Sequence, residues 1–521
     1  MNRLLSFLFF LSSTSWLVSA AIGPRTDLEI VNVNIAPDGY NRSSVLAGGT
    51  FPGPLIQGSK NAEFAINVID SLNDTSMNVA TSIHWHGLFQ HSTNYVDGPA
   101  FVTQCPIVPG NSFLYDFQAS GQTGTYWYHS HFQNQYCDGL RGPLVIYDPQ
   151  DPHGRLYDID DETTVITLAD WQVIHQSFDV YLAPSSTLIN GKGRYSGGPT
   201  DVDLAVVNVT AGKRYRFRLV SISCDPNFTF SIDGHNLTII EVDGNNVEPL
   251  VVDSIQIFAG QRYSFVLNAN QTAGNYWIRA LPPRGSYTDL VNLAVLHYHG
   301  AEDANPTVDP TTSIPTSSSP LVETNLHPLN PTGVPGSPSP GGADININLQ
   351  IGFNATAGGF TVNGVAFQPP SVPVLLQILS GTQNASDLLP SGSVYGLEAG
   401  KSVELTIPAF AFAGPHPIHL HGHSFHVVRS AGNTSYNYVN PVVRDVVSIG
   451  TGSTDEVTIR FFTDNPGPWF LHCHIDWHLN TGLAIVFAED VPEVPKDDFV
   501  TDSWKNLCPA YNEYVNSTGH T

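Results

Sequence analysis

The residues best suited to chemistry lie in one short segment near the C-terminal end of the chain, which reads His472-Cys473-His474-Ile475-Asp476-Trp477-His478. The pattern predicts a strand followed by a turn, and side chains alternate between the two faces of a strand. His472 and His474 are therefore expected on one face and Cys473 on the other. Two imidazoles and a thiolate form the ligand set of a blue-copper electron-transfer site, so Cys473 can bind one metal ion while its neighbours bind others. By itself the segment does not exclude a single zinc site or a buried cysteine between histidines.

Further histidines gather in three other segments that are expected to be strands. They are His84 and His86, His129 and His131, and His416, His419 and His421. A single His-x-His pair is weak evidence for a metal site, and we expect the pair His297 and His299 to be structural. Three imidazoles as close as those of residues 416–421 repel protons unless a metal binds them. With residues 472–478, these segments supply ten histidines and one cysteine, which is enough for four copper ions.

A threefold repeat indicates how these ligands are positioned. Each copy consists of a strand, a loop and a second strand that contains tryptophan, and the copies recur at intervals of roughly 150–190 residues. Directly after the tryptophan strand, the first copy has His129 and His131 and the third has His472 and His474, whereas the second has Arg279. We therefore expect metal ligands in the first and third copies and a spacer in the second.

Alternating apolar and polar residues predict strands throughout, as in residues 28–35 and 63–69, and hardly any segment has a helical pattern. A chain of 521 residues is long enough for two to four domains that each bury a core. We predict an all-β protein with three Greek-key β-sandwich domains at residues 21–151, 152–320 and 321–521. The second domain ends in a Pro/Ser/Thr-rich linker.

The N-terminal 20 residues have an early arginine, an apolar core and the small-residue end Val18-Ser19-Ala20, which predicts a secretory signal peptide. No later apolar run is long enough to span a bilayer. The net charge of -25, without any basic run, argues against nucleic acid or an anionic membrane as a partner. We expect a secreted, extracellular protein with N-linked glycans. Ten Asn-x-Ser/Thr sequons begin at Asn41, Asn73, Asn208, Asn227, Asn236, Asn270, Asn354, Asn384, Asn433 and Asn516.

Five cysteines are present, and in an oxidising compartment four of them are expected to pair. Cys473 is the expected free one, because a metal-bound thiolate cannot also form a disulfide. The count leaves three possible pairings among Cys105, Cys137, Cys224 and Cys508.

These motifs resemble the multicopper oxidases, and most closely the secreted fungal laccases, over the whole chain from Ala21 onward. The resemblance implies three cupredoxin-like domains and four copper ions per chain. A type 1 copper would be held by His416, Cys473 and His478, and a trinuclear cluster would lie between the first and third domains. Its type 2 ion would bind His84 and His419, and its type 3 ions would bind His86, His129 and His474, and His131, His421 and His472. The resemblance also implies disulfides Cys105–Cys508 and Cys137–Cys224.

The implied activity is that of a laccase. Phenolic donors (benzenediols, methoxyphenols, aromatic amines) would lose one electron at a time at the type 1 site, and a His-Cys-His relay would carry the electrons to the cluster that reduces dioxygen to water. A role in lignin or phenolic degradation and a monomeric state are further expectations. The alternatives are a sister oxidase that takes electrons from ferrous iron, ascorbate or bilirubin, and a copper-binding protein without enzyme activity.

Three other residues have implied roles. Asp225 matches an acid that accepts the phenolic proton near His478, although it can also be a turn residue before proline. Asp97 matches an acid near the type 2 copper that relays protons or orients a ligand. Leu483 occupies the axial position and cannot bind copper, which predicts an intermediate-to-high reduction potential. Asp476 is a weaker candidate and is expected to give structural support.

Overall fold

The computed structural model describes residues 21–172, 184–225, 227–283 and 285–520. The predicted signal peptide, residues 1–20, lies outside the described residues. Strands account for 39% of the structure and helices for 10%, which confirms the all-β prediction. Among the described residues, no helix is long and apolar enough to cross a membrane.

The first part of the chain forms two four-stranded sheets, with strand orders β2-β1-β4-β6 and β3-β8-β7-β5. Its elements are β1 (Arg25–Ile35), β2 (Arg42–Ala47), β3 (Ile56–Ser59), β4 (Glu63–Asp70), β5 (Ile83–His86), β6 (Ser112–Gln118), β7 (Gly124–Ser130) and β8 (Arg141–Tyr147). Inward residues of β4 and β6 alternate with exposed ones, as the period-two pattern predicts.

The middle part forms a seven-stranded sheet, β11-β10-β9-β13-β18-β15-β16, and a five-stranded sheet, β12-β20-β19-β14-β17. Its strands are β9 (Val165–Trp171), β10 (Ser186–Ile189), β11 (Lys192–Tyr195), β12 (Val206–Val209), β13 (Arg214–Ser221), β14 (Phe228–Ile232), β15 (Leu237–Val242), β16 (Asn245–Val252), β17 (Ile255–Ile257), β18 (Arg262–Asn268), β19 (Asn275–Leu281) and β20 (Leu293–Tyr298).

The last part forms two five-stranded sheets, β21-β25-β30-β27-β28 and β24-β32-β31-β26-β29, and the hairpin β22-β23. Its strands are β21 (Ile345–Asn348), β22 (Ile351–Asn354), β23 (Gly359–Val362), β24 (Val394–Leu397), β25 (Ser402–Pro408), β26 (Pro417–Leu420), β27 (Phe425–Arg429), β28 (Val443–Arg444), β29 (Val446–Ser448), β30 (Glu456–Phe462), β31 (Gly467–Cys473) and β32 (Ala484–Glu489). Its helices are α1 (Val374–Leu379), α2 (Asp476–Asn480), α3 (Val494–Asp497) and α4 (Asp502–Thr518).

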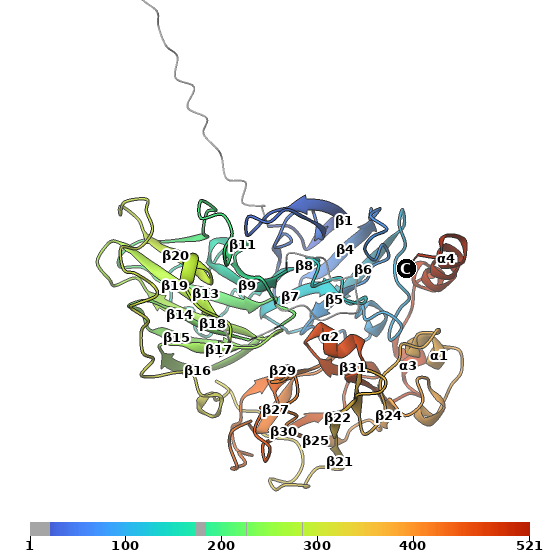
Figure 1. Cartoon of the computed structure of the whole chain (residues 1–521). Coiled ribbons are helices and arrows are strands. Elements are labelled where there is room, and N and C mark those ends of the chain that lie inside the picture. Colours follow the sequence, from blue (N-terminus) through green and yellow to red (C-terminus); the bar gives the residue numbers. More distant parts are fainter. Residues whose placement is uncertain (1–20, 173–183, 226, 284, 521) are drawn as a thin grey trace, which may run out of the picture.

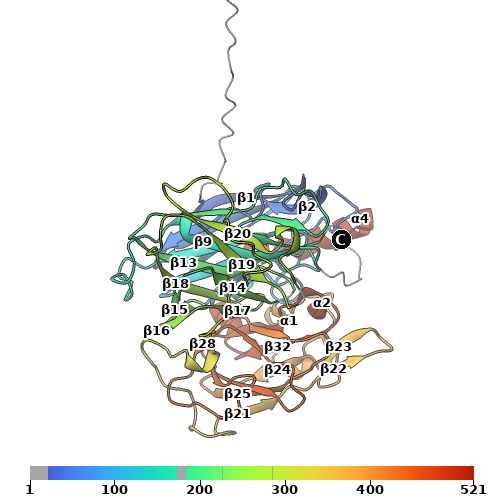
Figure 2. The ribbon, with the colours of Figure 1, turned by 60° about the vertical axis from the view of Figure 1, so that its left-hand side comes forward.

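Figures 1 and 2 show these three parts as three packed groups of strands, coloured blue to cyan, green to yellow and orange to red. The apolar cores run across the boundaries. Phe487 of the last part belongs to the same buried cluster as Phe265 of the middle part, and Phe470 belongs to the same cluster as Trp85 of the first part. This packing fixes β31, the strand that ends at Cys473, against the first part of the chain. The exact domain boundaries predicted from the sequence remain a prediction.

Strand register brings the histidine segments together in pairs. In the first part His84 of β5 lies opposite His129 of β7, and in the last part His419 of β26 lies opposite His472 of β31. Directly opposite residues in an antiparallel pair lie close enough for their side chains to interact. Each pair of neighbouring strands therefore presents imidazoles from two separate sequence segments.

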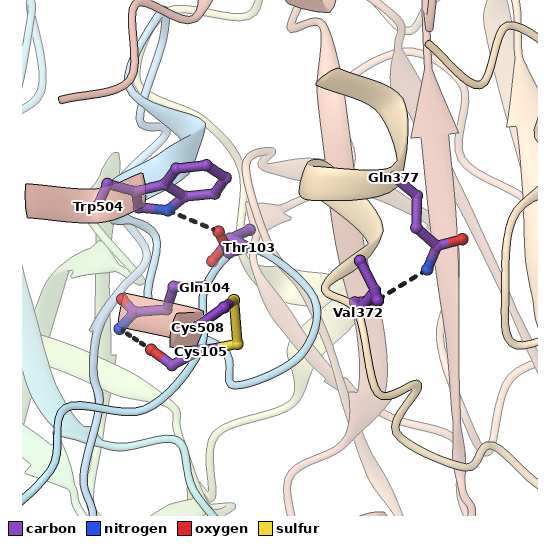
Figure 3. The surroundings of a disulfide bond; sticks show 7 residues. All are labelled: Thr103, Gln104, Cys105, Val372, Gln377, Trp504 and Cys508. Atoms are coloured by element: carbon purple, nitrogen blue, oxygen red, sulfur yellow. Dashed lines mark hydrogen bonds between the residues drawn. A yellow bond between two sulfur atoms is a disulfide. The ribbon is translucent and has the colours of Figure 1, made fainter. Parts of the chain in front are cut away.

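The C-terminal helix α4 returns to the first part of the chain, where Figure 1 shows it beside β6. The disulfide Cys105–Cys508 links α4 to the loop before β6. In the same loop, the carbonyl oxygen of Thr103 accepts from the Trp504 indole N–H at 3.0 Å. Figure 3 shows both contacts and, nearby, α1, where Gln377 donates to the carbonyl of Val372. The structure therefore confirms the first of the two implied disulfides.

The second implied disulfide, Cys137–Cys224, is not formed in the structure. Both residues are buried free thiols that interact with each other. Each also lies against a buried carboxylate, Cys137 against Asp476 at 3.5 Å and Cys224 against Asp170 at 3.2 Å. Each thiol donates a hydrogen bond to its carboxyl neighbour, which is how the reduced pair is accommodated in the core.

Candidate metal centre

A three-ligand site lies at the C-terminal end of β31. The Cys473 thiol is 3.4 Å from Nδ1 of His478 and 3.7 Å from Nδ1 of His416, and these two nitrogens are 3.1 Å apart. His416 directly precedes β26, and His478 lies on α2. Burial raises the pKa of the Cys473 thiol far above its ordinary value. A cation at the centre of this triangle would compensate the charge of the thiolate and allow it to form.

The two imidazoles of this site are held neutral and oriented. Burial lowers the pKa of His416 to about 4 and the pKa of His478 well below its ordinary value. Nε2 of His416 lies 3.1 Å from the carbonyl oxygen of Phe412, so the ring donates there and directs its Nδ1 lone pair toward Cys473. His416 therefore presents a nitrogen lone pair to the site, and His478 is held in the neutral form that binds metal ions.

Eight other histidines form one buried cluster between the first and last parts of the chain. Within each of the following groups, ligand atoms lie within 4.8 Å of one another: His84, His86 and His419; His86, His129 and His474; and His131, His421 and His472. Every group combines residues from both parts. The cluster therefore exists only when the first and last sandwiches are packed together.

Hydrogen bonds on the outer side of these rings direct the other nitrogen inward. Nδ1 atoms lie 2.8–2.9 Å from backbone carbonyl oxygens in four of them: His84, His129, His419 and His472. The Nε2 atoms of His84, His129 and His419 are buried and have no hydrogen-bond partner among the described residues. A buried imidazole nitrogen without a partner is costly unless a cation takes its lone pair. The donor set therefore fits bound metal ions.

Burial and mutual repulsion keep most imidazoles of this cluster unprotonated. Burial is the largest cause, and neighbouring imidazoles add to it, in lowering the pKa well below its ordinary value in His86, His129, His131, His419, His421 and His474. For His472 burial lowers the pKa to about 3. Neutral imidazole is the metal-binding form, and nitrogen ligands of this kind suit copper.

Asp97 connects two of these histidines from outside the cluster. It is fully buried, its carboxylate lies 2.8 Å from Nδ1 of His421 and 3.2 Å from Nδ1 of His84, and its backbone carbonyl also accepts from Nδ1 of His84. Such outer contacts fix the tautomer and orientation of a metal-binding ring. The predicted ligand-orienting position of Asp97 thus has a geometric basis.

Asp445 and Arg262 are functional candidates that the sequence reasoning missed. The Arg262 guanidinium donates to both carboxylate oxygens of Asp445 at 2.6 and 2.7 Å, and Asp445 lies 3.2 Å from Nε2 of His86. This contact turns Nδ1 of His86 inward, where it lies 3.2 Å from Nε2 of His474. Burial raises the pKa of Asp445 to about 6. The available sequence signal for Asp445 was the adjacent charged pair Arg444-Asp445 within the otherwise apolar run of residues 442–447.

Tyr136 is a second missed residue. Its hydroxyl donates to the carbonyl oxygen of His474 at 3.0 Å and lies 3.3 Å from Nδ1 of the same ring. It comes from the loop after β7, and no sequence pattern distinguished it from the other tyrosines of the core.

The remaining candidates lie near the three-ligand site or away from both sites. Asp225 is half-buried and close enough to raise the pKa of Cys473 electrostatically. Leu483 is buried, and its carbonyl accepts the N–H of Cys473 at 3.1 Å. Asp476 contacts Cys137 and not the histidines, as expected of a structural residue, and burial raises its pKa. His297 pairs with Asn275 and belongs to no metal-like group in the described chain.

The fold and the donor sets define a multi-domain β-sandwich metalloprotein with a two-histidine, one-cysteine site beside a histidine cluster. Multicopper oxidase family models match residues 29–151, 162–301 and 367–493. The chain belongs to the multicopper oxidase family and is an oxidoreductase with four copper ions as its cofactors.

Relatives and solved structures agree with this assignment. The chain is 59% identical over 507 residues to "Laccase-2" of Pleurotus ostreatus, covering 95% of this chain and 93% of the relative. It is 60% identical over 500 residues to "Laccase-2" of Trametes versicolor, covering 95% of both. The crystal structure of laccase from Botrytis aclada is similar with a TM-score of 0.80 and 32% identity, covering 96% of this chain and 92% of that one. Fet3p, described as a multicopper oxidase that functions in iron import, gives a TM-score of 0.82 at 27% identity, covering 94% and 95%.

Proposed function

We propose that this chain is a laccase that oxidises phenolic donors one electron at a time and reduces dioxygen to two waters. The observation that carries the proposal is the position of Cys473 between His472 and His474. The thiol faces His416 and His478, while its two sequence neighbours belong to the eight-histidine cluster. One strand segment therefore connects a site for electron entry with a site for dioxygen, and the laccase relatives support phenols as the donors.

Each group of side chains fits one metal ion. We assign His416, Cys473 and His478 to the type 1 copper and His84 and His419 to the type 2 copper. The type 3 pair takes His86, His129 and His474 on one ion, and His131, His421 and His472 on the other. Bound copper supplies the one-electron redox steps, and four ions together match single-electron donors to the four electrons that dioxygen requires.

On the donor side, His478 provides the point of contact with the substrate. The residue is 6% exposed, whereas His416 is fully buried. We assign to Asp225 the role of proton acceptor, because a phenol that loses an electron becomes strongly acidic and a nearby carboxylate can take its proton. The proximity of Asp225 to Cys473 supports this role.

On the dioxygen side, the residues of this chain hold ligands and supply protons. Asp97 fixes His84 and His421, and its carboxylate is a buried acceptor within reach of the cluster. We assign to it the delivery of protons to reduced oxygen, in addition to the orientation of the two rings.

Dioxygen uptake by the copper-loaded protein tests the function. A methoxyphenol, ferrous iron and ascorbate serve as alternative donors while peroxide is assayed. We expect rapid uptake with the phenol, four phenols consumed per dioxygen and no peroxide. The Cys473→Ser variant should lose this activity, and His299→Ala, at an exposed position away from both sites, should keep it. A preference for ferrous iron or ascorbate would overturn the donor assignment, and no uptake with any donor would overturn the enzyme assignment.

We further propose that the mature chain is a secreted, glycosylated monomer with a role in breakdown of lignin or other phenolic material. The fungal laccase relatives and the sequons support this proposal. We also propose that Cys137 and Cys224 form a second disulfide during export, losing two protons and two electrons to the thiol oxidants of the secretory compartment, because the two thiols interact in the core. Mass spectrometry of peptides from the unreduced secreted protein tests the glycans and this disulfide together.

A further inference from the structure

Four phenylalanines from two separate segments gather beside the three-ligand site. Phe353 and Phe360 lie opposite each other on the β22–β23 hairpin, and Phe410 and Phe412 lie in the loop that precedes His416. The ring centroids of Phe353 and Phe412 are 4.7 Å apart, those of Phe353 and Phe360 are 5.2 Å apart, and those of Phe360 and Phe412 are 6.2 Å apart. These distances are within the range of attractive aromatic contacts.

Both segments are attached to the ligands of the three-ligand site. The N–H of Phe360 donates to the carbonyl of Thr481 at 2.8 Å, and the Thr481 hydroxyl donates to the carbonyl of Trp477 on α2, the helix that carries His478. A Cβ atom at Gly359 would lie 2.5 Å from the Thr481 carbonyl oxygen, so a glycine is required for this close approach. On the other segment, the Phe412 carbonyl accepts from His416. The rings are therefore fixed relative to both histidines.

Exposure increases stepwise from His478 outward. Phe360 is 4% exposed, and its centroid is 4.4 Å from that of His478. Phe353 is 37% exposed and Phe412 is 55% exposed. No ring contact joins either of them to His478 among the described residues, so both lie one ring further out. The rings of Phe353 and Phe412, tilted by 44° to each other, form a contiguous apolar patch in contact with water, which is the kind of surface that lines ligand-binding grooves.

We propose that Phe353 and Phe412 form a second aryl subsite that favours phenolic donors with two linked aromatic rings. This inference rests on the proposed laccase function. One ring of the donor occupies the position beside Phe360 and His478 and is oxidised there. The other ring packs on the exposed faces of Phe353 and Phe412. Phenolic dimers, and not single-ring phenols alone, are therefore the substrate class that this surface fits.

The chemistry of the reaction is unchanged by the second subsite. Each turnover at the donor side breaks one phenolic O–H bond, releases one electron and one proton, and leaves a phenoxyl radical. Four such oxidations supply the four electrons and four protons that convert one dioxygen into two waters. The outer ring takes no part in electron transfer and contributes only binding, so its effect is expected in KM.

Kinetics with a matched pair of donors test the proposal. The probes are 2-methoxyphenol and its carbon–carbon linked dimer, assayed with the wild type, Phe412→Ala, Phe353→Ala and Phe412→Leu. We expect kcat/KM for the dimer to fall about 3- to 10-fold in the alanine variants, mainly through KM, and that for 2-methoxyphenol to change less than about 2-fold. Phe412→Leu keeps an apolar side chain without the ring, so its kcat/KM for the dimer should lie between those of the wild type and Phe412→Ala. Phe499→Ala removes another exposed phenylalanine, outside this cluster, and should change neither value.

The visible spectrum and the reduction potential of the type 1 site separate binding from damage to the site. Both should be unchanged in the Phe412 variants, because His416 donates to the backbone carbonyl of residue 412, which every substitution retains. An equal loss with both donors, or no loss with the dimer, would overturn the second subsite. If the wild type oxidises neither donor, the proposed function itself fails, which is a distinct result.

Discussion

Single residues decide what each histidine of this protein can do. In five of the ten imidazoles, a backbone carbonyl accepts from the outer ring nitrogen and so directs the other nitrogen into the site. Where a backbone carbonyl accepts from Nδ1, Nε2 faces the cluster, and where Phe412 accepts from Nε2, Nδ1 faces Cys473. Orientation of this kind costs little in a β-sandwich, because the carbonyls come from loops and strand ends whose positions the sheets already fix.

Asp97 provides the first prediction at this scale. Asp97→Ala removes the contacts of the carboxylate with both His84 and His421, so we expect dioxygen uptake to fall about 10- to 100-fold, the usual effect of losing such a contact. Asp97→Asn should lower dioxygen uptake less than Asp97→Ala does. Reduction of the type 1 site by a phenol without dioxygen, followed as loss of its blue absorption, should stay fast, because Asp97 contacts none of the ligands of that site. Asp116→Asn, an exposed acid on β6, is the control, and an unchanged uptake in Asp97→Ala would contradict the role.

Leu483 provides the second prediction. Leu483→Met places a thioether beside Cys473 with nearly the same volume, so the fold should tolerate it. An added axial donor stabilises the oxidised copper, and we expect the reduction potential to fall by about 60 mV or more, a tenfold change in a one-electron equilibrium. Redox titration of the blue absorption measures this. Leu483→Ile lacks a donor atom and should leave the potential near that of the wild type, whereas a rise in Leu483→Met would refute the assignment of the axial position.

At the scale of elements, the change from strand β31 to helix α2 brings Cys473 and His478, which are five residues apart, into the same three-ligand site. A strand alone would send alternate side chains to opposite faces and carry His478 away from Cys473.

The C-terminal elements connect two parts of the chain. Residues 497–508 attach the last part of the chain to the first. Asp498 accepts from the N–H of Asn94 at 3.0 Å, and Asp497 accepts from the hydroxyl of Ser92 at 3.0 Å. The Cys105–Cys508 disulfide adds a covalent link.

This C-terminal attachment should depend on pH. Burial raises the pKa of Asp498 to about 7, against about 3.9 in an unfolded chain. The folded protein therefore binds more protons than the unfolded chain between these values, and the contribution of Asp498 to stability is lost as the pH rises from about 4 to about 7. Asp498→Asn keeps an acceptor for Asn94 without a charge. We expect its Tm to exceed that of the wild type at pH 8 and to match it near pH 4.

Thermal unfolding across this pH range measures the effect as a difference between variants, so that other titrating groups cancel. Asp502→Asn changes a fully exposed carboxylate in the same segment and should show no such pH-dependent difference. A constant Tm difference between Asp498→Asn and the wild type from pH 4 to pH 8 would rule out a raised pKa at this position.

For the whole molecule, the cluster of eight histidines is the joint between the first and last sandwiches. Each of its groups takes ligands from both, and the middle part supports the joint through Arg262, which reaches Asp445 in a fully buried ion pair. Bound copper should therefore stabilise the assembly of the sandwiches as well as the local sites.

Removal of copper tests this. Ions that bind only the folded state stabilise it by about 4 kcal/mol when the free ion is at 1,000 times its dissociation constant. We expect chelator-treated protein to unfold at a clearly lower temperature in calorimetry, and reloaded copper to restore the original transition. The chelator should also lower the unfolding temperature of the Cys473→Ser variant, because the histidine cluster of that variant keeps its ligands. An unchanged transition after complete loss of copper would show that the sandwiches associate independently of the metal.

The sequence by itself determined the chemistry of the sites and the class of fold. The types and spacing of His84, His86, His416 and the 472–478 segment specify soft and borderline metal ligands, and period-two alternation specifies strands. The prediction that His472 and His474 face away from Cys473 holds because alternation is a local property of an extended backbone. The relation between the three sandwiches was likewise visible in the repeated tryptophan strands.

Only the tertiary structure decided which distant residues meet. Arg262 with Asp445, and Phe353 with Phe412, are brought together by packing between parts of the chain that no local pattern relates. A sequence pattern can indicate a buried charge such as Asp445 but not its partner, because the partner Arg262 lies far along the chain. Local spacing fixes what a residue can bind, and the burial of apolar surface between sandwiches fixes what it is placed beside.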